Sequence, residues 1–337
     1  MVGTWSGRIL LLNTAVFLVM ALLSGNLFMP SDDVLLVSGI KEPVALVQGE
    51  YWRLVTPMFV HIGLIHFAMN SFMLYIIGHQ LEYIVGGRWY LVIYLGAGIF
   101  GNVASAVFSV FPSAGASGAI FGLLGCGFFI ERSIGRILYE RTGRKPRQGV
   151  YTMTILLNVV LGLLIPFIDN AAHFGGLIAG AGLTYAMFCL RPNRLQHMNA
   201  GRGKFVIATL VAATAIGSYL ATSKDFVGGR LERTADASEE FQRAGRLYTN
   251  AMKIEPDNSL LYCKRGRLNL MQATEFQYKM LAFQDLRQCM MDVANVTWME
   301  NFIAELEVAG KGSDAVDLKQ MLQWQQQEST PKPSEAP

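Results

Sequence analysis

Long uncharged, apolar stretches alternate with short charged segments from the N-terminus to about Ser223. Each apolar stretch can form a helix of about 20 residues, which is the length that crosses a bilayer. The third stretch is about twice that length and contains Phe111-Pro112-Ser113-Ala114-Gly115, a cluster typical of a break between helices. The pattern therefore predicts seven spans, at about 9–28, 62–84, 89–111, 117–132, 148–168, 171–190 and 201–223.

The predicted fold class is all-α, a polytopic membrane helical bundle with a six-span core in residues 1–200 and a seventh span at 201–223. The composition agrees, because 52% of the 337 residues are hydrophobic and only 16% are charged, too apolar for an ordinary soluble protein. Alternatively, the first stretch is a cleaved signal peptide, since Arg8 provides a basic flank. Its apolar core exceeds the usual ~7–15 residues of a signal peptide, which favours a span.

Arginine and lysine gather in the loops after the fourth and sixth predicted spans. Such loops stay on the cytoplasmic side of a membrane. Both loops indicate one topology, with the N-terminus inside and the segment after the seventh span outside. The net charge of +3 mostly reflects these anchors and speaks against nucleic-acid binding. The cationic residues are Arg132, Arg136, Arg141, Arg144, Lys145, Arg147, Arg191, Arg194, Arg202 and Lys204.

These features predict a multi-pass integral membrane protein. Short loops and the lack of a recognisable transit peptide favour a bacterial inner (plasma) membrane. The segment Met29 to Val60 would lie on the outer side, partly in the lipid headgroup region. Tyr51, Trp52 and Arg53 fit that level, because aromatic residues beside arginine are enriched at membrane interfaces.

Residues 224–324 are polar and helical in pattern and predict an extracytoplasmic helical domain. Its helix-turn-helix sequence is similar to a tetratricopeptide repeat, and a small helical domain of no named family is the alternative. Such a domain would recruit a protein partner. Cys263 and Cys289 would form a disulfide if the domain lies in an oxidising compartment. Residues 325–337 are rich in Gln, Pro, Ser and Glu and are expected to be disordered.

Polar side chains within membrane spans are costly and mark candidate functional sites. Three groups stand out: His61 with His66 and Asn70, then Ser117, and then His173. They lie at the starts of the second, fourth and sixth spans. The topology places all three starts on the outer side, so these groups are expected at one level of the membrane.

Ser117 is the candidate nucleophile. Fourteen residues separate it from Glu131, roughly 21 Å of helix at ~1.5 Å per residue, which places it roughly 10 Å below the outer surface of a hydrocarbon core about 30 Å thick. A serine before a helix is most often only a cap. His173 changes that interpretation, because a histidine can take the proton of the serine hydroxyl.

His66 and Asn70 are one helical turn apart and face the same direction. Together with the backbone N–H of Ser117 they are candidate donors to an oxyanion. His61 would border the same pocket. The alternative for an intramembrane histidine is a packing or proton-relay residue, which is the role expected for His79; His197 lies in a predicted cytoplasmic loop.

The chain resembles the rhomboid family of intramembrane serine proteases. The resemblance covers about residues 5–190. It implies a Ser117–His173 dyad without the aspartate of soluble triads, and an oxyanion hole made by His66, Asn70 and the Ser117 amide. It also implies single-span membrane proteins as substrates, cut at or near the outer end of their helix. The motifs are Tyr51-Trp52-Arg53, His61 with His66 and Asn70, Gly115-Ala116-Ser117-Gly118-Ala119-Ile120-Phe121-Gly122, and Ala172-His173-Phe174-Gly175-Gly176 with Gly180.

The glycines of these motifs have a packing role of their own. Gly176 and Gly180 form a small face that permits close helix contact, which we expect to be with Gly118 and Gly122 of the fourth span. Generic membrane packing is compatible with the same contact. Gly115 would shape the turn before Ser117.

The sequence leaves two alternative functions and speaks against two other protease chemistries. An inactive rhomboid-like protein would typically lack the serine or the histidine, and both are present. A transporter is the other alternative, since intramembrane histidines and glycine-broken helices also mark transport pathways. A metalloprotease would need a His-Glu-x-x-His sequence, and an aspartyl protease needs two intramembrane carboxylates, whereas only Asp169 lies near a span. No cofactor and no metal are expected.

Overall fold

The computed structural model describes residues 3–134, 149–165, 168–190, 199–272 and 275–329. The chain divides into two compact units, Met1–Ser223 and Lys224–Pro337. Within these described residues every regular element is helical, and the only β pairing is an isolated bridge between Lys41 and Ser113. The all-helical prediction is confirmed for this part of the chain.

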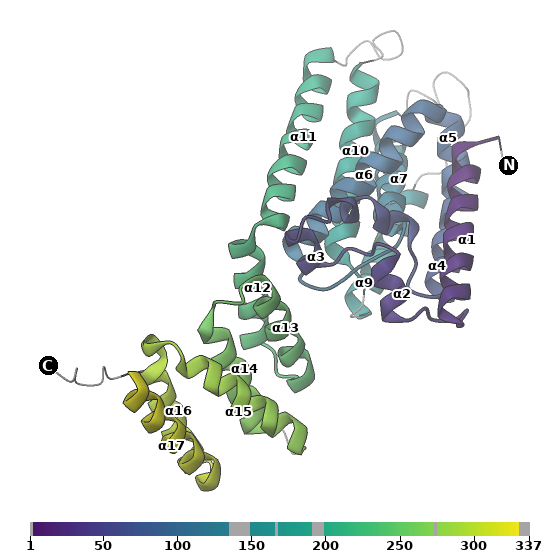
Figure 1. The fold of residues 1–337 in the computed structure, drawn as a ribbon. Coiled ribbons are helices and arrows are strands. Elements are labelled where there is room, and N and C mark those ends of the chain that lie inside the picture. The colour runs from purple at the N-terminus through teal and green to yellow at the C-terminus, as the bar shows by residue number, and fades with distance from the viewer. Residues whose placement is uncertain (1–2, 135–148, 166–167, 191–198, 273–274, 330–337) are drawn as a thin grey trace, which may run out of the picture. The chain divides into compact units, whose positions relative to one another are not determined.

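The first unit is a bundle of helices whose ends lie within a few residues of the predicted spans (Figure 1). The second predicted span is one continuous helical segment made of three parts: the α-helices α4 and α5 and, between them, the π-helical turn η3. The helices are α1 (Trp5–Ser24), α4 (Leu64–Met73), η3 (Leu74–Gly78), α5 (His79–Val85), α6 (Gly87–Phe108), α7 (Ser117–Phe129), η4 (Ile130–Ile134), α9 (Val150–Leu164), α10 (Asn170–Cys189) and α11 (Ala200–Thr222).

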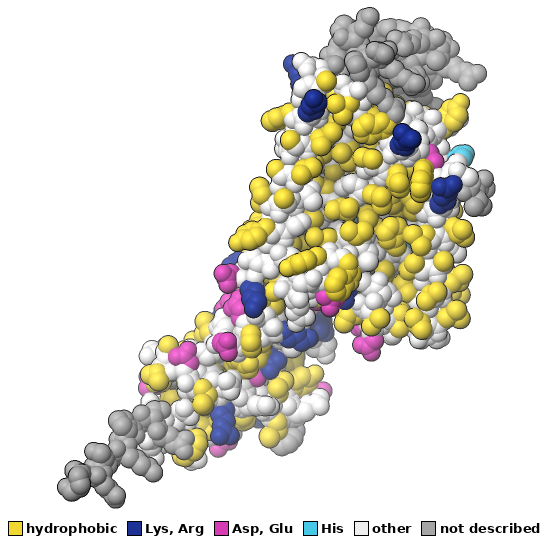
Figure 2. Space-filling model, turned by 45° about the horizontal axis from the view of Figure 1, so that its top comes forward, with side chains coloured by type: hydrophobic (Ala, Val, Ile, Leu, Met, Phe, Trp, Pro, Cys, Tyr) yellow, Lys and Arg dark blue, Asp and Glu magenta, His cyan; other side chains and the backbone are white. Residues whose placement is uncertain are grey.

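Among the described residues, four helices are long and apolar enough to cross a membrane: α1, α6, α10 and α11. Helix α9 is apolar but shorter. The number of spans therefore stays a prediction. Figure 2 shows hydrophobic side chains covering much of the visible face of the first unit, as a lipid-facing surface requires.

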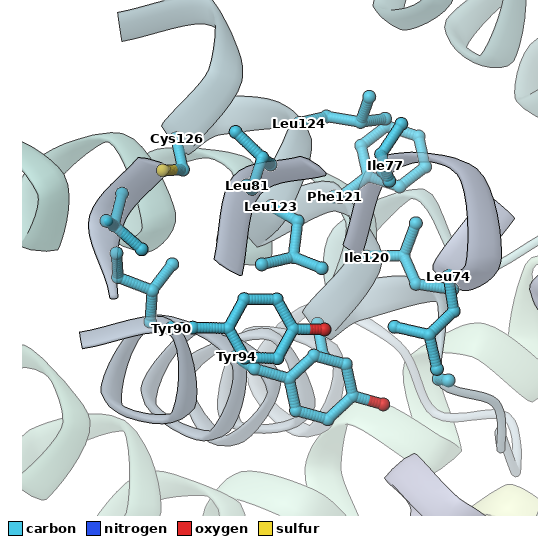
Figure 3. Close-up of a cluster of buried hydrophobic side chains, with 14 of the residues drawn as sticks. Leu74, Ile77, Leu81, Tyr90, Tyr94, Ile120, Phe121, Leu123, Leu124 and Cys126 are labelled. Atoms are coloured by element: carbon cyan, nitrogen blue, oxygen red, sulfur yellow. The ribbon is translucent and has the colours of Figure 1, made fainter. Parts of the chain in front are cut away.

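The core of the first unit forms where α6, α7 and the η3–α5 segment meet (Figure 3). Tyr90 and Tyr94 of α6 are fully buried and stack with ring centroids 6.3 Å apart. Leu123 and Leu124 of α7 pack in the same cluster. This core holds the helix that begins with Ser117 against its neighbours.

The outer segment folds into short helices: α2 (Asp32–Val37), α3 (Pro43–Val47), and the 3₁₀ turns η1 (Tyr51–Leu54) and η2 (Thr56–Phe59). Arg53 is buried and holds this segment together. It pairs with Glu50 at 2.6 Å and donates to the carbonyls of Leu36 and Ile40. Trp52 is 55% exposed, and its place in the headgroup region stays a prediction.

Helix α10 packs backbone to backbone against α7. A Cβ on Gly176 would overlap the carbonyl of Gly118, and a Cβ on Gly180 would overlap the carbonyl of Gly122. The expected contact between these glycines is present in the structure. Close contact of these two helices matters because α7 begins at Ser117 and α10 carries His173 in its first turn.

The described residues of the second unit form three consecutive helix pairs, with the 3₁₀ turn η5 (Val293–Asn295) before the third (Figure 1). The first two pairs repeat with a period of 35 residues (259 − 224), close to the 34 of a tetratricopeptide repeat. The assignment to that repeat class stays a prediction. The pairs are α12 (Lys224–Asp236) with α13 (Phe241–Ile254), α14 (Ser259–Gln272) with α15 (Phe276–Met290), and α16 (Val296–Val308) with α17 (Gly312–Ser329).

A disulfide joins Cys263 of α14 to Cys289 of α15, and both residues are buried. The loop that it closes spans 26 residues, for which the chain-entropy relation gives about 3.5 kcal/mol of stabilisation. Cys126 and Cys189 are buried and free. The bridge links the two helices of the second pair, α14 and α15.

Replacing Cys263 and Cys289 together by alanine is expected to make the second unit markedly more sensitive to limited proteolysis in the full chain, because the unfolded state regains loop entropy. Intact-mass analysis of the fragments, after proteolysis at rising temperature, measures this sensitivity. The matched control is the Cys126→Ala, Cys189→Ala variant, whose second unit should resist as in the wild type. Equal sensitivity of both variants to proteolysis would show that the disulfide does not stabilise the second unit.

One expectation differs from the structure. Residues 325–329 were expected in a disordered tail, but α17 continues through Ser329. Several other predictions fall outside the described residues: the cationic loops with Arg136, Arg141, Arg144, Lys145, Arg147, Arg191 and Arg194, the loop residue His197, and the tail at 330–337.

Candidate active site

Ser117 lies at the first residue of α7, directly after a sharp turn. Gly115 adopts φ +133°, a conformation that favours glycine, and its N–H donates to the carbonyl of Pro57 at 2.9 Å. The N-cap residue is Ala116, and no side chain caps the helix. The hydroxyl of Ser117 is thus not used as a helix cap.

The Ser117 hydroxyl instead meets His173. The Nε2 atom of His173 lies 2.8 Å from Oγ of Ser117. The imidazole stacks on the ring of Phe121, with centroids 4.1 Å apart and an interplanar angle of 11°. Among the described residues, Nδ1 of His173 has no hydrogen-bond partner. The pair therefore has the geometry of a nucleophile and its base, without a carboxylate hydrogen-bonded to the base.

His66 lies on the other side of the turn before Ser117. A Cβ on Gly115 would come within 2.6 Å of Cε1 and 2.7 Å of Nε2 of His66, and 3.7 Å from Oγ of Ser117. Only a glycine leaves room for the imidazole at that position. His66 therefore neighbours the nucleophile, as expected for an oxyanion donor.

Asn70 is buried one turn further along α4, and its Nδ2 donates to the carbonyl of His66 at 2.9 Å. One amide hydrogen is thus used within the helix and a second is left for another acceptor. His61 is fully buried and packs edge to face on His66, with centroids 5.4 Å apart. His61 therefore lies next to the His66 ring, and its role at the pocket stays a prediction.

The remaining predicted residues lie around this centre in structural positions. Gly118, Gly176 and Gly180 form the contact between α7 and α10, and Arg53 with Trp52 belongs to the outer segment. His79 lines a separate cavity of about 310 Å³ between α1 and η3. In the part of the chain that the structure describes, no group of histidine, cysteine and acidic residues is arranged to hold a metal ion.

Sequence reasoning assigned no role to one polar neighbour of the dyad. Asp169 caps α10, one turn before His173, and its carboxylate interacts with Ser105 of α6. The sequence carried a weak signal for it, because Ser105 is a polar residue within an apolar span. Lys41, which is fully buried, interacts electrostatically with the same carboxylate.

Comparison with known proteins shows the family. The model of the Rhomboid domain matches residues 48–190. Rhomboid protease GluP of Bacillus subtilis is 35% identical over 257 residues, 76% of this chain and 46% of that protein. RHOMBOID-like protein 6, mitochondrial, of Arabidopsis thaliana is 35% identical over 195 residues, 56% of this chain and 59% of its own length.

The chain thus spans about half the length of these two curated relatives. The rhomboid protein YdcA of Bacillus subtilis is 32% identical over 146 residues, 42% of this chain, and the match covers 70% of that relative. Both Ser117 and His173 lie inside the matched Rhomboid domain. The chain therefore belongs to the rhomboid family.

Proposed function

We propose that this protein is an intramembrane serine endopeptidase that cleaves single-span membrane proteins at or near the outer end of their transmembrane helix. The observation that carries the proposal is the hydrogen bond between Ser117 and His173 at the start of two apolar, closely packed helices. A serine alone is a poor nucleophile, and a histidine in hydrogen-bond contact activates it. Relatives named rhomboid proteases support the same activity.

Each step of the reaction has a residue assigned to it. Oγ of Ser117 attacks the peptide carbonyl carbon while its proton passes to Nε2 of His173. The imidazolium then gives that proton to the leaving amine, the C–N bond breaks, and an acyl ester remains on Ser117. Water, deprotonated by His173, attacks the ester, and the acid product leaves as the Ser117 hydroxyl regains its proton.

The negative oxygen of each tetrahedral intermediate needs hydrogen-bond donors. The backbone N–H of Ser117 is at the start of a helix, where the dipole also favours an anion. His66 lies beside Gly115, within reach of the same space, and Asn70 has an amide hydrogen left over. These three groups form the proposed oxyanion hole.

We assign the active site to the outer side of the membrane, with the N-terminus cytoplasmic and the second unit extracytoplasmic, in a bacterial inner (plasma) membrane. The Cys263–Cys289 disulfide supports an oxidising location for the second unit. No catalytic cluster is assigned to that unit, and its helix pairs offer a surface for a protein partner. The lipid bilayer is the second partner, because the substrate reaches Ser117 from within it.

The test uses the full chain in liposomes with a model single-span protein as substrate. The wild type is expected to release two fragments, and a fluorophosphonate is expected to label Ser117. The Ser117→Ala variant should take no label. Equal labelling of the wild type and of Ser117→Ala would overturn the assignment of Ser117 as the nucleophile. Solute flux through the liposomes that survives Ser117→Ala would overturn the proposal and favour transport.

Replacing Asn70 by alanine is expected to lower kcat, by up to about 10²-fold, because one donor to the oxyanion is lost. KM should change little, since the ground-state carbonyl makes weaker use of that donor. Steady-state cleavage of the model substrate measures both constants. The control is Asn158→Ala on α9, whose amide likewise donates to the carbonyl one turn back, that of Thr154. Equal losses of kcat in the two variants would argue against the assignment of Asn70 to the oxyanion hole.

A further inference from the structure

Polar and charged side chains join the start of α10 to three other parts of the first unit. Asp169 caps α10, and its Oδ1 accepts a hydrogen bond from the N–H of Ala172 at 3.0 Å. Its other carboxylate oxygen accepts from the hydroxyl of Ser105 on α6. The hydroxyl of Ser105 also lies 3.2 Å from that of Ser113, in the loop before Ser117. Lys41 of the outer segment interacts electrostatically with the Asp169 carboxylate.

This cluster is unusual because it places charge in an apolar bundle. Lys41 and Ser105 are both fully buried. The backbone of Lys41 pairs with that of Ser113 through two hydrogen bonds of 2.8 and 3.0 Å, so the outer segment is held at the loop that leads to the nucleophile. Asp169 itself is half-buried. Burying an ammonium beside a half-buried carboxylate costs more than packing apolar residues of similar volume. Retaining them points to a function.

The backbone connects the cluster to both halves of the dyad. Asp169 is the N-cap residue of α10 and precedes His173 by four residues, and the N–H of His173 donates to the carbonyl of Asp169 at 3.2 Å. The carboxylate also interacts electrostatically with the imidazole. Ser113 stands at the same spacing before Ser117. Movement of the cluster would therefore shift both Oγ of Ser117 and Nε2 of His173.

We propose that Asp169 is a positioning residue for the Ser117–His173 dyad. Its carboxylate fixes the first turn of α10 against α6 and the loop before Ser117, and its negative charge favours the imidazolium that forms when Ser117 gives up its proton. The fully buried Lys41 supplies the opposite charge next to this half-buried carboxylate. Unlike the aspartate of a soluble triad, Asp169 acts on His173 through space and through the helix, without a hydrogen bond to Nδ1.

This inference rests on the proposed protease function, and the experiment separates the two. In the Asp169→Asn variant the amide oxygen still accepts from the N–H of Ala172, but the charge is gone. We expect kcat for the model substrate to fall about tenfold, a part of the 10²–10⁴-fold that a positioned base contributes. The rate of fluorophosphonate labelling of Ser117 should fall equally, while KM stays within about twofold.

A double variant distinguishes positioning from a merely structural role. Asp169→Asn leaves Lys41 buried without its opposite charge and should lower the melting temperature. Adding Lys41→Met should recover the melting temperature but not kcat. The matched control is Glu42→Gln, because Glu42 caps α3 through the N–H of Ala45 at 2.7 Å and lies on another helix; its kcat should equal that of the wild type.

Two results would overturn the inference while leaving the protease function intact. One is an unchanged kcat in Asp169→Asn, with an active wild type. The other is recovery of kcat together with the melting temperature in the Lys41→Met, Asp169→Asn double variant, which would mean that the cluster only stabilises the fold. A wild type that neither cleaves nor takes the label would defeat the proposed function itself, and this inference with it.

Discussion

Replacing Ser117 by alanine is expected to reduce cleavage of a single-span substrate to background, a loss of about 10⁴-fold or more. Replacing His173 by alanine should cost about as much. The physical reason is that the two atoms 2.8 Å apart act as one unit: without the base the hydroxyl stays protonated, and without the hydroxyl the base has nothing to activate.

The double variant sharpens this expectation. If Ser117 and His173 act as a unit, Ser117→Ala combined with His173→Ala should be no slower than either single variant. The measurement is single-turnover cleavage in liposomes, with fragment sizes read by mass spectrometry. Losses that multiply in the double variant would show that the two residues act independently, and full activity in either single variant would sink the mechanism.

The second large effect is expected at the contact of α7 with α10. In Gly180→Ala the new Cβ would overlap the carbonyl oxygen of Gly122 and come within 2.5 Å of its Cα. Those are backbone atoms, so the two helices must separate. Overpacking of this kind costs about 1–3 kcal/mol, and the melting temperature in detergent should fall.

Activity should fall further than stability alone explains. Helix α10 carries His173 and α7 carries Ser117, and a displacement of about 1 Å between reacting groups costs about 10²-fold. The matched control is Gly182→Ala on the same helix, because its Cβ would meet only Leu210 and Val206 side-chain atoms at 3.4 Å. If the two variants have equal melting temperatures and equal kcat, the close contact does not position the dyad.

The glycine contact was predictable because glycines spaced four apart on an apolar helix have little other use. The dyad was predictable for a similar reason, since a serine and a histidine at matching ends of two spans are costly in lipid. By contrast, Asp169 looked like an ordinary helix-edge residue. Only the folded chain brings Ser105 and Lys41 to its carboxylate. These residues are far apart in the sequence, so their contact could not be predicted from it.

Local geometry inside the predicted elements was also out of reach of the sequence. The π-helical turn Leu74–Gly78 lies inside a uniformly apolar span, and hydrophobic pattern does not distinguish it from an α-helix. The Asn70 amide donates to the carbonyl of His66, a choice between neighbouring acceptors that packing decides.

The sequence by itself determined the helical class, the approximate ends of the helices in the first unit and the identity of the candidate nucleophile and base. The reason is that a membrane makes every charged or polar residue costly, so its placement along the chain carries information. The tertiary structure alone decided that Ser117 Oγ and His173 Nε2 meet, that Gly115 makes room for His66, and that Asp169 ties the base to α6. Those contacts depend on close packing between helices that are distant in the sequence, and the order of residues does not give the distances between them in space.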